Sequence, residues 1–241
     1  MPIFEPPPGF VDLLSDAEDA PDRGVWCDLE VPGVGTVRAR RPRPKSAAAL
    51  AMSVSEDHLV PADVAELDAK EREHALERQQ GRYRTEFVRD HLADGEFDRL
   101  MTDMMDPDLD LPGDTMGRVA RCIATWGTPR PYIAVLSLAL ESARHWRALR
   151  FKIQTCGIAD PMRLPSLHSV LDHMEQLALE SFDHDDKGRA ERDQWIGRLY
   201  RPDPPMPGAK AAAKELPPPV PAGFSPEETR QSFAALARAA R

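Results

Sequence analysis

Residues 131–153 read PYIAVLSLALESARHWRALRFKI, the most apolar stretch of the chain. Polar side chains are nearly absent through Leu140, and four basic side chains follow. A glycine and a proline lie shortly before the stretch and Gly157 lies after it, and both residue types commonly end helices. We therefore predict that residues 131–153 form one central, buried helix.

Helical periodicity continues on both sides of this helix. Apolar residues recur with the 3.6-residue period at residues 116–126 and 167–182, which predicts two amphipathic helices. The same spacing relates Phe97, Leu100, Met101 and Met104, which we expect to lie in the core. Residues 68–82 are instead charged nearly all round, which predicts a helix that projects into solvent or spans between packed parts, with a break at Gly81.

A small β-hairpin is predicted near the N-terminus. Two runs of strand-forming residues, 25–31 and 34–40, flank Pro32 and Gly33, a pair suited to a tight turn. The second run ends in a cluster of five cations: Arg38, Arg40, Arg41, Arg43 and Lys45. This cluster suits either an acidic partner or the chain's own acidic N-terminal arm.

The fold class that follows is mainly α, with a small hairpin followed by a compact multi-helix domain. The proline content, 24 of 241 residues, also indicates segments outside the core. We expect five segments: a disordered acidic arm (1–23), the hairpin with its basic end (24–43), the helical domain (44–201), a proline-rich linker (202–223) and a short C-terminal helix (224–241).

The overall charge restricts the classes of partner. The chain carries 31 Lys and Arg against 40 Asp and Glu, a net charge of −9. Nucleic acid and anionic membranes both attract a positive surface, so neither is expected as a general partner. The longest uncharged apolar run, residues 131–140, is about half of what a membrane-spanning helix needs. Residues 1–22 lack Lys and Arg, unlike a secretory signal, so we expect a cytoplasmic protein.

The sequence contains no recognisable catalytic, cofactor or metal motif. Gly33 and Gly35 form a G-x-G, but the third glycine and the following helix of a dinucleotide site are missing. His168 and Asp172 stand one helical turn apart, without the spacing of a known zinc site and too close together for a catalytic triad. The three cysteines share no paired spacing, which predicts buried, reduced thiols. We therefore predict a non-enzymatic protein without cofactors.

Charge is unevenly distributed along the chain. Residues 118–163 contain eight basic and two acidic side chains, whereas residues 96–114 contain seven acidic and one basic. Such neighbouring segments suit intramolecular pairing, self-association or a charged protein partner. The candidate partner-binding residues are the five cations of the hairpin end, three residues of an exposed helix expected over residues 64–80 (Val64, Leu67 and Leu76), and the apolar side of the C-terminal helix (Phe224, Phe233 and Leu236).

Several segments together resemble the tail assembly chaperones of siphophages that infect actinobacteria. They are GDTMGRVARCIATWGTPRPY at 113–132, SARHWR at 142–147 and GFSPEE at 223–228, with RDHLADGEF at 89–97 and EVPGVG at 30–35 similar in place and character. The resemblance covers most of residues 24–241 and consists of packing segments rather than catalytic signatures.

The resemblance implies a helical protein that binds the tape measure protein and keeps it soluble while the tail tube polymerises around it. It also implies that the protein acts in the host cytoplasm and is absent from the mature virion. In that family a longer form often arises by ribosomal frameshifting, so that form and the major tail protein are further expected partners, and self-association stays open.

Two other readings remain. The chain is also consistent with a minor tail or connector protein that is retained in the virion. A small regulator that contacts DNA through the five-cation cluster is disfavoured by the net charge.

Overall fold

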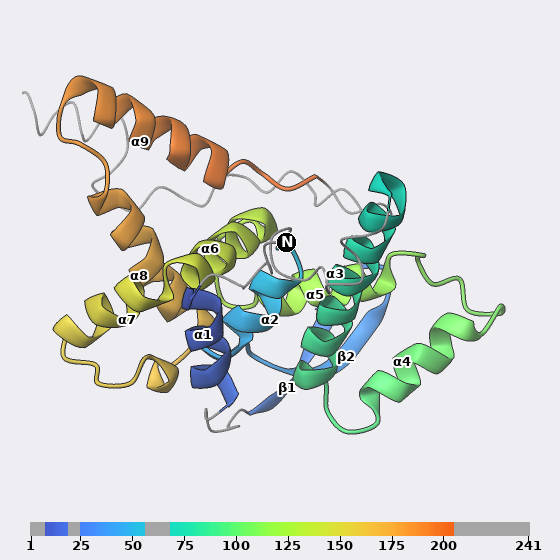
Figure 1. Ribbon diagram of the computed structural model, residues 1–241. Helices are drawn as coiled ribbons and strands as arrows, with labels where there is room; N and C mark the ends of the chain where they lie inside the picture. Colours follow the sequence, from blue (N-terminus) through green and yellow to red (C-terminus); the bar gives the residue numbers. More distant parts are fainter. Residues whose placement is uncertain (1–7, 19–24, 56–67, 205–241) are drawn as a thin grey trace, which may run out of the picture. The chain divides into compact units, whose positions relative to one another are not determined.

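The computed structural model describes residues 8–18, 25–55 and 68–204 of the 241-residue chain (Figure 1). The described elements are α1 Pro8–Glu18, β1 Trp26–Val31, β2 Gly35–Arg40, α2 Ser46–Met52, α3 Ala69–His91, α4 Glu96–Met105, α5 Thr115–Ala124, α6 Tyr132–Arg144, α7 Trp146–Thr155, the 3-10 helix η2 Pro161–Arg163, α8 Leu167–Glu180 and α9 Asp186–Leu199. The prediction of a mainly α fold with one small N-terminal hairpin is confirmed. None of the described helices is long and apolar enough to cross a bilayer.

Helix α6 is the centre of the described core. It packs against α2 most extensively and also contacts α1, α5, α7, α8 and α9. Its buried residues are Ala134, Val135, Leu138, Ala139, Ser142 and Ala143. Four of the six are small, so the neighbouring helices can approach its backbone closely. The prediction that this stretch is central and buried is therefore correct.

The prediction of a single helix over residues 131–153 is wrong, because the chain turns at His145 between α6 and α7. The Ser142 hydroxyl donates to the carbonyl of Leu138 (2.7 Å), the kind of bond that bends helices. After the turn, Trp146 is fully buried and its indole N–H donates to Asp16 of α1 (2.6 Å). The turn at His145 thus places the Trp146 ring in the core and its N–H group beside the Asp16 carboxylate.

The hairpin forms where it is predicted. β1 and β2 pair antiparallel, with Trp26 opposite Arg40 and Val31 opposite Gly35. The end of β2 is joined to the start of the loop after α3, since Ala93 N–H donates to the carbonyl of Arg38 (2.9 Å). The hairpin is therefore part of the helical core and not an appendage to it.

Helix α1 corrects the prediction of a disordered acidic arm over residues 1–23. Within that segment Pro8–Glu18 is helical, and Phe10 and Leu13 are each 1% exposed in the core beside α6 and α7. Two half-buried acidic side chains of α1 contact α7: Asp12 pairs with Arg147, and Asp16 pairs with Arg150 (3.3 Å). Two of the acidic residues that suggested disorder thus form ion pairs between α1 and α7.

Helix α3 runs through Gly81 without a break, contrary to the prediction. Its N-terminus has a capping box, in which Glu71 N–H donates to Asp68 (2.9 Å) and Asp68 N–H donates to Glu71 (3.1 Å). The residues around Gly81 are good helix formers, so one glycine costs only about 1 kcal/mol relative to alanine. The first half of α3 is exposed as predicted, from Ala69 to His74.

The end of the described chain also differs from the expected linker boundary at residue 202. The Asp203 carboxylate accepts hydrogen bonds from the backbone N–H groups of Tyr132 (2.6 Å) and Ile133 (3.1 Å). It therefore caps the N-terminus of α6, and it pairs there with Arg121 of α5 (3.1 Å). Asp203 belongs to the helical domain, whereas the rest of the predicted linker from residue 205 and the C-terminal helix lie outside the described residues.

Replacing Phe10 by alanine tests whether α1 is part of the core. Phe10→Ala should lower the free energy of unfolding by about 3 kcal/mol, because it leaves a cavity between α1 and its neighbours. Val11→Ala, on the half-exposed side of the same helix, should change it by less than about 0.5 kcal/mol. Urea unfolding followed by circular dichroism measures both. Equal, small effects of the two substitutions would show that α1 does not pack in the core.

Gly81→Ala tests the continuity of α3. No atom lies within 4 Å of the position that a Cβ would take at Gly81, so alanine should stabilise the protein by about 0.5–1 kcal/mol. Gly157→Ala is the control. A Cβ at Gly157 would also meet no atom within 4 Å, but Gly157 has φ +85°, so alanine there should lower the free energy of unfolding by about 1 kcal/mol. Calorimetry should show a higher unfolding temperature for Gly81→Ala and a lower one for Gly157→Ala. A loss of stability in Gly81→Ala would contradict a continuous helix.

Candidate protein interface

The structure places the five-cation cluster at the seam between the hairpin and the helices. Arg40 donates to the carbonyl of Asp90 (2.9 Å) and its guanidinium lies over the Trp26 ring, 5.0 Å from the centroid. Arg43 donates to the carbonyl of Pro165 (3.1 Å). These two guanidinium groups therefore join the hairpin end to α3 and to the loop before α8.

The remaining cations of the cluster are arranged differently. Arg41 is exposed and lies over the Trp126 ring at 5.6 Å, while Arg38 is exposed near Glu96. Lys45 is half-buried at the N-cap position of α2. A role for the cluster in partner binding stays a prediction, and Arg38 and Arg41 are the members that the structure leaves accessible.

The other predicted partner-binding residues are only partly described. Leu76 is half-buried on α3, among side chains that are mostly charged. Val64, Leu67, Phe224, Phe233 and Leu236 lie outside the described residues. Leu76 is therefore the only one of these six residues that the structure places.

The basic segment at residues 118–163 is not a free positive patch. Each of its eight cations has a carboxylate within 4 Å, and the pairs are Arg118–Asp114, Arg121–Asp203, Arg130–Asp172 and Glu175, Arg144–Glu141, Arg147–Asp12, Arg150–Asp16, Lys152–Glu180 and Arg163–Asp160. Several of these pairs join residues that are distant in the sequence. Intramolecular pairing, one of the three explanations left open, therefore occurs in this segment, but only Arg118–Asp114 joins it to the acidic segment at residues 96–114.

Arg130 is the most buried cation of this network whose carboxylate partners lie on another element. Its guanidinium contacts Asp172 and Glu175 of α8, each at 2.6 Å, and Tyr200 donates to the same Glu175 carboxylate (2.7 Å). Burial opposes the charge on Arg130, but the hydrogen bonds to the two carboxylates outweigh it and raise the pKa of the guanidinium. The loop before α6 is thereby fixed to α8 and to the end of α9.

The acidic segment at residues 96–114 differs from the basic segment because it carries exposed apolar side chains. On α4 only Leu100 is buried, whereas Met101 and Met104 are each 37% exposed and Met105 is 81% exposed. Leu109, in the loop that follows, is 46% exposed. The prediction that Met101 and Met104 lie in the core is therefore wrong. A helical apolar period shows that a helix has an apolar face, but it does not show that the same chain covers this face.

We call the exposed residues Met101, Met104, Met105 and Leu109 the methionine stripe. Figure 1 shows α4 joined to α3 and α5 by loops on either side. Seven carboxylates lie along residues 96–114, and the single cation, Arg99, is held by Glu96 (2.9 Å) and Asp103 (2.7 Å). Asp114 pairs with Arg118 (2.7 Å), and no ion pair within 4 Å is found among the described residues for Asp98, Asp106, Asp108 and Asp110.

The described residues hold no cluster of side chains that could bind a metal ion. No three His, Cys, Asp or Glu side chains among them converge on one point. His168 is buried, which lowers the pKa of its imidazole, and Asp172 is committed to Arg130. All three cysteines are free thiols, but Cys27 and Cys156 are exposed, so the prediction that all are buried is wrong.

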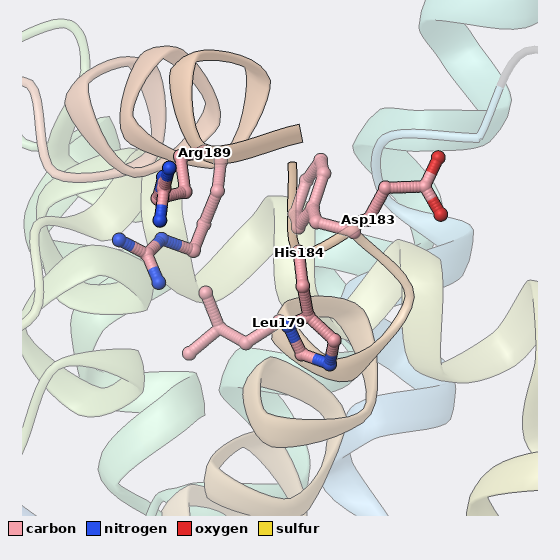
Figure 2. A pocket seen from close by; sticks show the side chains of 6 residues that line it. Leu179, Asp183, His184 and Arg189 are labelled. Atoms are coloured by element: carbon pink, nitrogen blue, oxygen red, sulfur yellow. The ribbon is translucent and has the colours of Figure 1, made fainter. Parts of the chain in front are cut away.

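A pocket of about 320 Å³ lies between the end of α8 and the start of α9 (Figure 2). Its lining residues are Leu179, Phe182, Asp183, His184, Arg189 and Arg192. The two guanidinium groups already have partners, since Arg189 pairs with Asp186 and Arg192 contacts Asp193 (3.3 Å). We therefore assign no ligand to this pocket.

Comparison with known families gives two adjacent matches. Residues 3–131 match the model of a family described as phage tail assembly chaperone protein, and residues 141–241 match a family of unknown function. The first match includes α4 and the methionine stripe, and the gap between the matches falls within α6. No curated protein and no solved structure matches the chain.

The Arg130 network makes a prediction about stability. Arg130→Met should lower the free energy of unfolding by about 2–3 kcal/mol, because Glu175 would keep its charge in a largely buried place. Arg163→Met removes the same charge from an exposed pair with Asp160 and should change stability by less than about 0.5 kcal/mol. Urea unfolding of both variants is the measurement, and equal losses would contradict a structural role for Arg130.

Proposed function

This chain belongs to the phage tail assembly chaperone family, and we propose that it is a non-enzymatic chaperone that binds the tape measure protein of a siphophage. In this proposal it keeps the tape measure protein soluble while the tail tube polymerises, acts in the cytoplasm of an actinobacterial host, and is absent from the mature virion. The family membership carries the proposal, and the uncovered methionine stripe supports it physically.

The methionine stripe suits a chaperone because such a protein has to cover apolar surface reversibly. A long helical partner presents repeated apolar side chains before it is assembled, and such surface promotes aggregation if it is left exposed. A short amphipathic helix can cover part of it by helix-to-helix packing. Methionine fits this task because its unbranched side chain adapts to differently shaped neighbours.

A longer product made by frameshifting is also part of the proposal. It would carry the same N-terminal residues and therefore the same methionine stripe. Mass spectrometry of infected cells tests this directly: two products that share their N-terminal peptides support the frameshift, and one product throughout infection counts against it.

Capture from infected cells tests the proposed function. The tagged chain should co-purify with a very long helical protein during tail assembly, and the tag should be missing from purified virions. The matched measurement is co-expression of the two proteins, in which the soluble fraction of the tape measure protein should rise several-fold. Presence of the tag in virions at a constant copy number would instead identify a minor tail or connector protein.

A further inference from the structure

The attachment of α4 leaves one of its sides free. The first half of the helix is held to the hairpin, since Arg38 N–H donates to Glu96 (3.3 Å), Arg99 donates to the carbonyl of Thr36 (3.4 Å), and Leu100 is buried. The second half carries Met101, Met104 and Met105. Met104 and Met105 each lie about one helical turn after Met101. The three exposed side chains therefore form a short ridge along the helix.

The charges around this ridge are uncompensated. Among the described residues, Asp98, Asp108 and Asp110 have no cationic group within 4 Å, and the only cation on α4 is already held by Glu96 and Asp103. An uncompensated set of like charges beside an apolar ridge attracts cations on an approaching partner. We name the methionine stripe together with Asp98, Asp108 and Asp110 the α4 surface.

The basic segment of a second copy does not complement this surface. The eight cations at residues 118–163 are all paired within their own chain. The first half of α3 has exposed cations, but it alternates them with acids, and Leu76 is half-buried there. These two segments of a second copy are therefore not the source of the complementary cations, and we take the partner to be another protein.

We propose that the α4 surface binds an amphipathic helix of another protein, with an apolar stripe flanked by Lys or Arg. This inference rests on the proposed chaperone function and names the chemistry of the partner segment. The ten residues of α4 extend over about 15 Å, which corresponds to about three turns of a partner helix. The thioethers contact the apolar stripe, and the three carboxylates face the flanking cations.

Two synthetic peptides test the chemistry of the partner. Both are 18 residues long and have leucine at helical spacing, and one has lysine at all other positions whereas the other has glutamate. The full chain should bind the lysine peptide at least about tenfold more tightly, and its affinity should fall as sodium chloride is raised from about 50 to about 300 mM. Fluorescence anisotropy of labelled peptides measures the affinities.

Variants assign the binding to α4. Replacing Met101, Met104 and Met105 by serine should weaken binding of the lysine peptide about tenfold or more, since three apolar contacts are lost. Replacing Asp98, Asp108 and Asp110 by asparagine should weaken it about three- to tenfold and flatten the salt dependence. The control for the methionine variant is Ile133→Ser with Phe151→Ser, since these two side chains are 50% and 69% exposed away from α4. The control for the aspartate variant is the triple substitution Asp183→Asn, Glu191→Gln and Asp193→Asn. The affinity of each control variant for the lysine peptide should stay within about twofold of the wild-type affinity.

The outcomes separate this proposal from its competitors. Equal losses in the α4 variants and the controls would show that only net charge matters and would overturn it. A dimer in light scattering that the three Met→Ser substitutions abolish would show that a second copy covers the surface, which also overturns it. Circular dichroism confirms that the variants are folded.

The two proposals fail in different ways. If the wild type and the Met→Ser variant capture the tape measure protein equally, the chaperone proposal stands and the α4 surface is not its binding site. If the peptides discriminate as expected but the tape measure protein is not captured, the α4 surface binds another helix and the chaperone proposal falls.

Discussion

The packing of α6 against helices from both ends of the described chain is the constraint on which the fold depends. α1 and α2 approach it from the N-terminal side of the sequence, and α8 and α9 approach it from the C-terminal side. The approach of α1 is so close that a Cβ at Gly9 would lie 2.5 Å from the carbonyl oxygen of Ala143. Because the gap between the two family matches falls within α6, residues of both matched regions contribute to one core and not to two separable domains.

The ion pairs follow from the same arrangement. When α1 and α8 pack on α6 and α7, their acidic side chains reach two arginines and one lysine of α7. A cluster of like charges in the sequence therefore does not imply a charged surface, because partners that are distant in the sequence can neutralise it. The opposite holds for the α4 surface, because no cationic group lies within 4 Å of Asp98, Asp108 or Asp110 among the described residues.

Strong periodicity predicted most of the fold. The helices around Ile123 and Leu171, the hairpin and the burial of residues 131–143 follow from local patterns that packing did not override. The failures have two physical causes. α1 was hidden by its acidic composition, since its stability comes from Phe10 and Leu13 docking on distant helices and not from local preference. The α4 surface was hidden because periodicity reports an apolar face without reporting what covers it, and exposed side chains at Met104 and Met105 are visible only once the packing is known.

The docking of α1 has a consequence for synthesis. Asp12 and its partner Arg147 are separated by 135 residues, so α1 emerges from the ribosome long before the helix that holds it. At about 5–20 residues per second, the delay is about 7–27 s. During that time the nascent chain exposes Phe10 and Leu13 and has no groove to receive them. Docking of α1 therefore waits for translation of α6 and α7, although α1 itself is made much earlier.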